Sequence, residues 1–283
     1  MERMTTFSPT INQAADRRSD EAQEPQIAPA AGTGILSGTV RRNLVGFGLF
    51  LALWAVGALF FPAYVLPSPL AVLRNLPVHV DGAFPRHLAV TLGRVGVGFG
   101  AAFVLGTALG IGGYILRATQ QLNTLMVAQQ VVPGTILGVI FLLIFGVGGA
   151  TAVALVALLT LPLIAINTAN ALAKVDRQWV EVLTVMGGGT MDRVRYLYLP
   201  TLVPTIQSNV ALGFGLALKV AILGEFLGAQ DGLGYLLNVA RVYFRMDEVF
   251  FYLFIVLLTT LVFQIAQTLF FTVGLKRYVD EVA

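Results

Sequence analysis

Residues 151–172 read TAVALVALLTLPLIAINTANAL and contain no charged side chain. A helix must keep about 20 consecutive, mostly apolar residues to cross the hydrocarbon core of a bilayer. In lipid, an open strand would leave backbone N–H and C=O groups unpaired, whereas a helix pairs them internally. This stretch therefore predicts a membrane-spanning helix.

Five further apolar runs lie on either side of this stretch. They cover residues 44–61, 88–115, 122–145, 201–223 and 249–275. Gly146, Gly148 and Gly149 predict a turn just before residue 151, and Lys219 interrupts the run 201–223. Glycines in the run 88–115 are expected to let helices pack closely. We therefore expect an all-α membrane protein with about six transmembrane helices.

The composition agrees with this fold class and excludes several kinds of site. Apolar residues make up 57% of the 283 residues, charged residues 12%, and the mean hydropathy is +0.80. A soluble domain carries roughly a quarter charged residues. The chain has no cysteine, which excludes disulfides and thiolate chemistry. His79 and His87 are not spaced as a metal pair, and the net charge of +3 is small, so neither a metal site nor a nucleic-acid partner is expected.

The first 40 residues are polar and contain Pro9, Pro25, Pro29 and a mixed-sign cluster from Asp16 to Glu24. Such a segment has too little apolar surface to bury, which predicts a disordered tail. A signal peptide would need a basic start followed directly by an apolar core, and that order is missing. We expect a disordered tail over residues 1–40 and a transmembrane domain over residues 41–283.

The orientation follows from the distribution of lysine and arginine between the loops, because cytoplasmic loops are enriched in both. With the N-terminus inside, the external loops hold Arg74, Arg86, Arg241 and Arg245. The cytoplasmic segments then hold Arg3, Arg17, Arg18, Arg41, Arg42, Arg117, Lys174, Arg177, Arg193, Arg195, Lys276 and Arg277. This asymmetry predicts that both termini are cytoplasmic.

The loop 173–200 is long for a connector and mixes apolar with charged residues. Trp179, Val180 and Leu183 alternate with charged neighbours at a spacing typical of a short amphipathic helix, and three glycines, 187–189, then break the chain. Such a helix can fill a groove on another protein. It can equally rest on lipid headgroups. The residues alone leave both interpretations open.

A motif within this loop resembles a known family. It consists of Glu181-Val182-Leu183, three residues, Gly187, nine residues, Leu197, one residue and Leu199-Pro200. This spacing is similar to the EAA loop of permease subunits in bacterial type I ABC importers. Val182 and Leu183 replace the two alanines of that motif, and Leu197 replaces its isoleucine. The resemblance implies that these seven residues form a coupling element that docks on an ATPase subunit.

The resemblance covers about residues 64–275, and three further segments look like one branch of these permeases. They are FPAYVLPSPLAVLRNL at 61–76, HLAVTLGRVGVGFG at 87–100 and GEFLGAQDGLGYLL at 224–237. That branch serves nitrate, sulfonates, taurine, bicarbonate and vitamin precursors. Residues 129–133, QQVVP, depart from it, because relatives often carry a more basic run there.

The resemblance also implies partners and a location. The partners would be ATP-binding cassette ATPase subunits, a second permease copy, an external substrate-binding protein and the lipid of the bacterial plasma membrane. The chain has no Gly-x-x-x-x-Gly-Lys-Ser/Thr phosphate loop. We therefore expect no enzymatic activity and no bound cofactor in this chain, with ATP and Mg held by the partner subunits.

Three polar residues inside the apolar runs are candidates for lining a substrate path: Gln129, Gln130 and Lys219. The glutamines could instead form bonds between helices, and Lys219 could pair with Glu225 or extend its amine outward. Arg94 is expected to have a packing or headgroup role. The alternative function is an ion-coupled secondary transporter, although such proteins usually show buried carboxylates near the midplane or inverted repeats.

Overall fold

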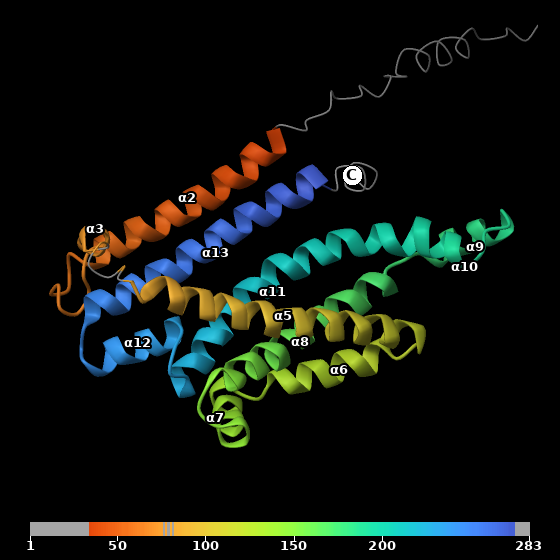
Figure 1. The fold of residues 1–283 in the computed structure, drawn as a ribbon. Helices are drawn as coiled ribbons and strands as arrows, with labels where there is room; N and C mark the ends of the chain where they lie inside the picture. The colour runs from red at the N-terminus through yellow and green to blue at the C-terminus, as the bar shows by residue number, and fades with distance from the viewer. Residues whose placement is uncertain (1–33, 76, 78–79, 81, 275–283) are drawn as a thin grey trace, which may run out of the picture. The chain divides into compact units, whose positions relative to one another are not determined.

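The computed structural model describes residues 34–75, 77, 80 and 82–274, and every regular element in this part of the chain is a helix (Figure 1). The chain divides into two units, Met1–Thr39 and Val40–Ala283. Of the first unit only residues 34–39 are described, as the start of a helix. The fold below concerns the second unit. Six residues that entered the predictions above lie outside the described residues: Arg3, Arg17, Arg18, His79, Lys276 and Arg277.

Four described helical segments are long and apolar enough to cross a membrane. They are α5 (Phe84–Ile115), α8 (Gly149–Ala173), a continuous stretch from Thr190 that includes α11 (Leu199–Gly228), and α13 (Met246–Gly274). The apolar part of α2 (Gly34–Gly57) is shorter and runs from Asn43 to Gly57. With one bent pair, these helices occupy the places of the six predicted spans.

The bent pair corrects one prediction. Residues 122–145 were expected to form one helix, but the structure has α6 (Thr119–Gln130) and α7 (Gly134–Phe145), which meet at an angle of 82°. Pro133 lies at the break and serves as the N-cap of α7. Proline has no N–H and disfavours helical geometry in the residue before it, so the helix stops ahead of it. The third apolar run is therefore a broken span.

The core of the bundle is the packing of α5 against α8. Gly98, Ala102, Gly106 and Gly110 are buried at intervals of four residues along α5. A Cβ atom on Gly98 would lie 2.7 Å from Val156 Cβ, and one on Gly110 would lie 2.7 Å from Thr168 Cβ. Small residues on one face let two membrane helices approach to backbone contact. The expected role of these glycines is confirmed, although a Cβ at Gly93, Gly96 or Gly100 would meet nothing within 4 Å.

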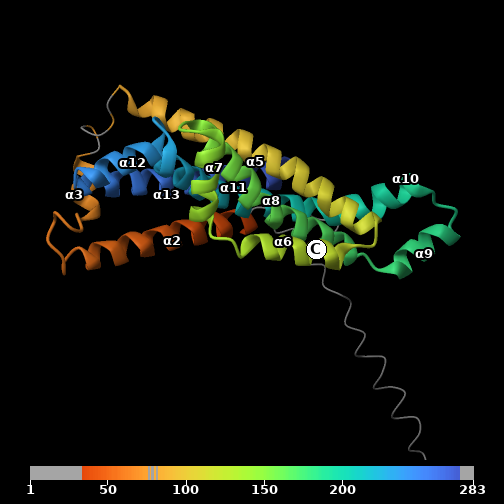
Figure 2. The same ribbon diagram turned by 90° about the horizontal axis from the view of Figure 1, so that it is seen from below.

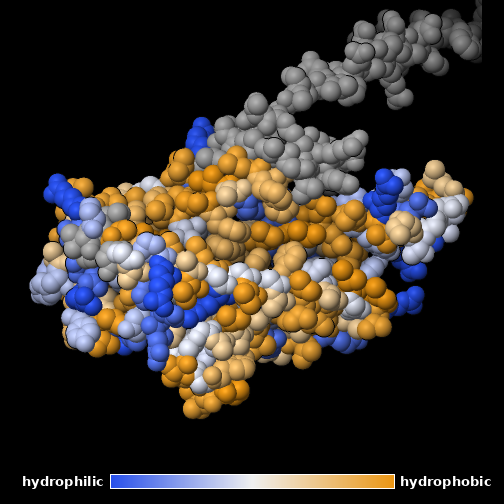
Figure 3. Space-filling view, viewed as in Figure 1, coloured by the Kyte–Doolittle hydropathy of each residue, from blue (hydrophilic) through white to orange (hydrophobic). Residues whose placement is uncertain are grey.

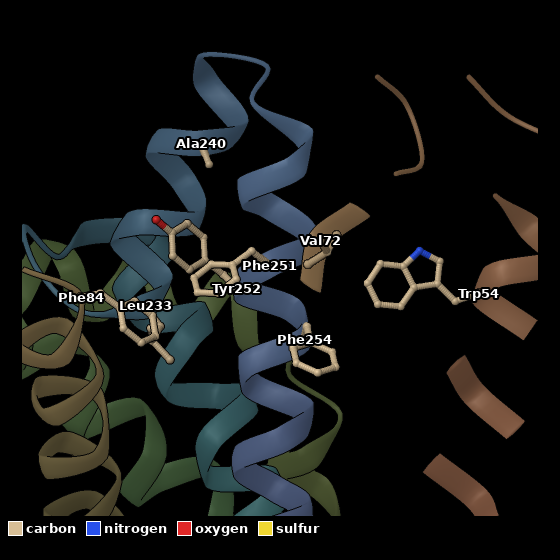
Figure 4. Close-up of a cluster of buried hydrophobic side chains, with 8 residues drawn as sticks. All are labelled: Trp54, Val72, Phe84, Leu233, Ala240, Phe251, Tyr252 and Phe254. Carbon is tan, nitrogen blue, oxygen red and sulfur yellow. The ribbon is translucent and has the colours of Figure 1, made fainter. Parts of the chain in front are cut away.

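A second buried cluster lies at one end of the bundle, which we call the α12 end. Figure 4 shows the side chains that α2, α3 (Pro69–Arg74), α5, α12 (Leu233–Val242) and α13 contribute to it. Trp54 reaches into it from α2 and donates its indole N–H to the carbonyl oxygen of Pro67 over 3.0 Å. The members are Trp54, Val72, Phe84, Leu233, Ala240, Phe251, Tyr252 and Phe254. The helix α12 was not predicted.

The opposite end carries α9 (Arg177–Val185) and α10 (Thr190–Arg193), and we call it the α9 end (Figures 1 and 2). In Figure 3, apolar surface covers the middle of the view, and hydrophilic residues gather around α12 and around α9 and α10. This distribution is the one expected for a protein whose middle contacts lipid and whose two ends contact water.

Candidate functional site

The loop 173–200 folds into short helices, as its spacing predicted. Asp176 is the N-cap of α9, and its Oδ1 accepts a hydrogen bond from the backbone N–H of Gln178 over 2.9 Å. After the glycines, α10 passes into a five-residue π-helical segment, η1 (Val194–Tyr198), and η1 passes into α11. The second half of the loop is thus the beginning of a long membrane helix.

The end of α9 has a defined geometry. Gly187 has φ = +83°, and its N–H donates to the carbonyl oxygen of Thr184 over 3.0 Å. The N–H of Gly188 donates to the carbonyl oxygen of Leu183 over 2.8 Å. These two bonds are those of a Schellman motif, which closes a helix with a left-handed residue that is usually glycine. The glycine of the sequence motif is therefore explained by its backbone conformation, which closes α9.

The outward face of α9 is apolar. Trp179 is 63% exposed and Val185 is 88% exposed, and Val182 and Met186 are also exposed. Trp179, Val182 and Met186 are spaced at three and four residues, so they lie on one face of the helix. Glu181 is also exposed, next to Val182 in the chain. An apolar face of this kind at the end of a bundle is typical of an interaction surface.

Three contacts organise the loop and join it to the bundle. A guanidinium nitrogen of Arg193 donates to Thr184 Oγ1 over 3.2 Å, which links α10 to α9. The N–H of Gly189 donates to Asp192 Oδ2 over 2.8 Å. The hydroxyl of Tyr114, in α5, lies 3.3 Å from that of Tyr198 in η1. The loop is therefore tied to α5 as well as to α11.

The motif residues are divided among three elements. Glu181, Val182 and Leu183 lie on α9, with Gly187 at its end, whereas Leu197 lies on η1 and Leu199 and Pro200 begin α11. A cavity of about 460 Å³ lies between the start of α9 and the junction of η1 with α11. Trp179, Leu197 and Pro200 line it, together with Lys174, Val175, Asp176, Tyr196 and Thr201. The structure brings Leu197 and Pro200 close to α9, while Glu181 lies outside this cavity.

The path candidates lie in different surroundings. Gln129 Nε2 donates to the carbonyl oxygen of Leu158 over 2.7 Å, so Gln129 forms the bond between helices that was its alternative role. Gln130 is exposed at the end of α6, next to the break. Lys219 is exposed on α11. The cavity beside α9 and the cavity between α8 and α11, described below, are lined by none of these three residues.

The pairing of Lys219 with Glu225, which was one of the alternatives for Lys219, is not formed. Glu225 is 1% exposed, and its Oε1 accepts from Arg94 Nη1 over 2.9 Å. Arg94 also donates to the side chain and the carbonyl oxygen of Asp231. On a regular helix, residues six apart do not share a face, so Lys219 and Glu225 point in different directions. Arg94 has a packing role, as expected, but its partners are carboxylates.

A polar cluster that the sequence reasoning missed lies near the α9 end. Asn123 Nδ2 donates to Asn170 Oδ1 over 2.7 Å, and Asn167 Nδ2 donates to Asn209 Oδ1 over 2.8 Å. A cavity of about 480 Å³ opens beside these residues, between α8 and α11. It is lined by Asn167, Asn170, Ala171, Lys174, Thr201, Pro204, Thr205 and Ser208. Asparagines three residues apart in an otherwise apolar run were the available signal.

An exposed stripe on one face of α11 begins at this cavity. Pro204, Ser208, Leu212 and Lys219 are all exposed, at intervals of four, four and seven residues, so they form one stripe. The stripe ends at Lys219, in the half of α11 toward the α12 end. A lysine on a membrane helix is costly unless it meets water or a partner. The stripe is therefore a candidate wall for a water-filled path.

Comparisons with known proteins agree with these features. Residues 102–272 match the family described as binding-protein-dependent transport system inner membrane component. The formylaminopyrimidine transport permease protein ThiX of Halalkalibacterium halodurans is 31% identical over 191 residues, 67% of this chain and 76% of that protein. The riboflavin transport system permease protein RibX of Chloroflexus aurantiacus is 31% identical over 217 residues, 75% of this chain and 81% of that protein.

Two further comparisons extend the picture. The putative aliphatic sulfonates transport permease protein SsuC of Bacillus subtilis is 27% identical over 213 residues, 74% of this chain and 77% of that protein. Among solved structures, the inward-facing methionine ABC transporter MetNI matches with a TM-score of 0.56 and 21% identity, covering 65% of this chain and 93% of the matched chain. That likeness concerns the fold. None of these relatives supports an ion-coupled secondary transporter.

Proposed function

The chain belongs to the binding-protein-dependent transport system inner membrane components, and we propose that it moves a small solute when ATPase subunits act on its loop 173–200. As a member of this family it is a multi-pass permease of the inner membrane, of the type I ABC importer class. The proposal adds the docking surface, the partners and the path.

The observation that carries the proposal is the exposed apolar face of α9, which lies just before the helical stretch Thr190–Gly228 that enters the membrane. Trp179, Val182 and Met186 supply apolar area, and Glu181 supplies a charge at its edge. Binding energy in protein interfaces is concentrated in buried aromatic and apolar anchors, a role that Trp179 fits. We call residues 173–200 the coupling loop.

Beyond α9 and the turn that ends it, the link from the coupling loop into the membrane is helical. From Thr190 to Gly228 the chain forms one helical stretch of 39 residues, and only its first turns belong to the coupling loop. When ATPase subunits close around ATP, displacement of α9 and α10 would tilt α11. ATP and its Mg would be held by those subunits, so this chain would hydrolyse nothing itself.

The solute path in this proposal lies between two permease copies, identical or related. The stripe on α11 from Ser208 to Lys219 forms part of its wall, with the polar cavity at the end near the coupling loop. Gln130, exposed at the break between α6 and α7, lies on the same path, whereas Gln129 holds α6 against α8. An extracytoplasmic binding protein would deliver the solute at the α12 end. We assign the permease domain to residues 41–283, with residues 1–40 as a cytoplasmic tail.

The docking proposal is tested by protection of single cysteines in this naturally cysteine-free chain. Trp179→Cys should react with a thiol reagent in the isolated permease and be protected in the complex with its ATPase subunit. The control is Phe60→Cys. Phe60 is exposed just after the C-terminal end of α2, and its cysteine should react equally in both samples. Equal reaction of Trp179→Cys in both samples would contradict docking on α9.

A further inference from the structure

One face of α5 satisfies the N-terminus of α12. The first N–H groups of a helix have no partner within the helix and need one from elsewhere. The N–H of Gly232 donates to His87 Nδ1 over 2.9 Å, and the N–H of Leu233 donates to Thr91 Oγ1 over 2.8 Å. His87 and Thr91 are one helical turn apart on α5. The cap of α12 therefore comes from a helix more than 140 positions away in the sequence.

Glu225 completes this cap from α11. Its Oε2 accepts from the N–H of Gly234 over 2.9 Å and from the hydroxyl of Thr91 over 2.8 Å. Its Oε1 accepts from Arg94, seven positions after His87 on the same face of α5. A buried carboxylate is stable only when such bonds and a cation satisfy it. Here both oxygens are satisfied.

The backbone is shaped around this carboxylate. Gly232 has φ = +99°, a conformation that side-chain-bearing residues rarely adopt, and a Cβ on it would overlap the Glu225 carboxyl group. A Cβ on Gly234 would lie 2.6 Å from Glu225 Cβ. The turn between α11 and α12 thus has no room for other residues at these two positions. We call His87, Thr91, Arg94, Glu225 and Asp231 the Glu225 cluster.

The cluster also reaches the turn between α7 and α8. The N–H of Gly148 donates to the carbonyl oxygen of Gly228 over 2.8 Å. A Cβ on Gly149 would lie 2.5 Å from Arg94 Nε, so the guanidinium lies directly over the start of α8. Arg94, which belongs to α5, therefore contacts α8, α11 and the α11–α12 turn at one point. A planar guanidinium with five donors is suited to such a junction.

The position of Glu225 on α11 gives the cluster a consequence for transport. Glu225 lies at the far end of the helical stretch that begins in the coupling loop. Leu199–Gly228 alone extends about 45 Å at 1.5 Å per residue. These bonds tie the end of α11 to α5 and to α12, so a displacement of α11 that reaches Glu225 would be passed on to α12.

We propose that Arg94, Glu225 and Asp231 are positioning residues that make α12 move as one body with α11, so that the tip 241–245 reports the state of the coupling loop. The tip is exposed at every position from Arg241 to Arg245. The proposal rests on the proposed function, because it needs an ATPase subunit to move α11. Its residues contact neither the coupling loop nor the proposed path.

The test uses the full permease–ATPase complex in lipid nanodiscs. A single cysteine at Tyr243, which is 70% exposed, is labelled with an impermeant maleimide in the absence of nucleotide and with ATP and vanadate. In the otherwise unchanged chain the two labelling rates should differ. In Glu225→Gln the complex should assemble, but the two rates should become equal. Arg245→Gln, which removes the surface pair with Glu248, is the matched control and should keep the difference.

A merely structural role makes a different prediction. It would lower assembly and thermal stability together, and any complex that assembled would keep its state-dependent labelling. If Glu225→Gln does not assemble, Asp231→Asn decides, because Asp231 lies at the half-buried edge of the cluster. Persistence of the rate difference in an assembled Glu225→Gln or Asp231→Asn complex overturns the proposal.

The same samples separate this proposal from the proposed function. If Trp179→Cys is protected by the ATPase subunit but the Tyr243 label never depends on nucleotide, the positioning role is wrong and docking stands. If Trp179→Cys is not protected, docking on α9 fails, and the positioning role fails with it.

Discussion

The backbone N–H of Gly188 donates to the carbonyl oxygen of Leu183 over 2.8 Å, five residues back across the end of α9. That bond forms only because Gly187, between them, has φ = +83°. It ends α9 and turns the chain toward α10, so the exposed face of α9 and the start of α11 are held in a fixed relation. The shape of the coupling loop depends on this one turn.

Replacing Gly187 should therefore impair coupling more than replacing Gly189, two residues later. A side chain in the left-handed region costs roughly 1–2 kcal/mol, and more when it is β-branched. Gly187→Val should strongly lower transport-linked ATP hydrolysis while leaving the amount of permease in the membrane unchanged. Gly189 has φ = −84°, so Gly189→Ala is the control and should remain active. Equal activity of both variants would count against the turn.

The orientation is tested by labelling intact cells. The count of lysine and arginine predicts that Lys174 faces the cytoplasm and that the α12 tip faces outward. A cysteine at Tyr243 should react with an impermeant thiol reagent from outside, and one at Lys174 should react only after the membrane is opened. Reaction of the Lys174 position in intact cells would invert the topology. Arg41 should behave as Lys174 does.

Lys219 offers a test of the proposed path. Among the described residues it has no ion pair, and it lies on the exposed stripe of α11. A buried lysine without water costs roughly 2.5–3.5 kcal/mol at the centre of a span. Lys219→Met should keep the thermal stability of the purified complex and lower solute uptake. Unchanged uptake would remove Lys219 from the path, and a joint loss of stability and uptake would assign it to packing.

Close packing of α5 on α8 predicts a position-specific loss of stability. A Cβ on Gly110 would lie 2.8 Å from the carbonyl oxygen of Ala165, whereas one on Gly112 would meet nothing within 4 Å. Overpacking typically costs about 1–3 kcal/mol. Gly110→Val should therefore lower the melting temperature in detergent, and Gly112→Val should change it little. Similar melting temperatures for the two variants would contradict the packing.

The sequence predicted the spans better than their interruptions. Apolar length alone located the membrane helices, because the requirement for about 20 apolar residues is strict. The break at Pro133 was missed because the run continues across it: α6 and α7 taken together are apolar enough to be counted as one span. Proline is also an imperfect signal, since Pro162 and Pro204 lie inside helices that continue.

The Glu225 cluster shows a second limit. Arg94 and Glu225 are 131 positions apart, and each had a nearer or simpler explanation in the sequence. Only the packing of α5 beside α11 reveals that they meet, and that Lys219 does not pair with Glu225. The short helix α12 was missed for a related reason. The groups that cap its N-terminus come from His87, Thr91 and Glu225, so the sequence next to α12 contains no capping side chain that would mark its start.

The short helices of the loop 173–200 were predicted from its spacing and its glycines, and the structure confirms them, whereas the docking role of the motif stays a prediction. The side chains that the motif specifies lie on α9, η1 and α11, and only the structure shows the cavity between α9 and the other two. The motif thus located the surface but not its internal geometry.

The most direct measurement is ATP hydrolysis by the reconstituted complex, with and without the solute-loaded binding protein, for the unsubstituted chain and for Glu181→Arg. A reversed charge at an interface costs several kcal/mol in juxtaposed like charges or lost pairs. We predict that Glu181→Arg permease inserts normally but that loaded binding protein no longer stimulates ATP hydrolysis. Full stimulation with Glu181→Arg would contradict the claim that α9 carries the signal between the ATPase and the membrane helices.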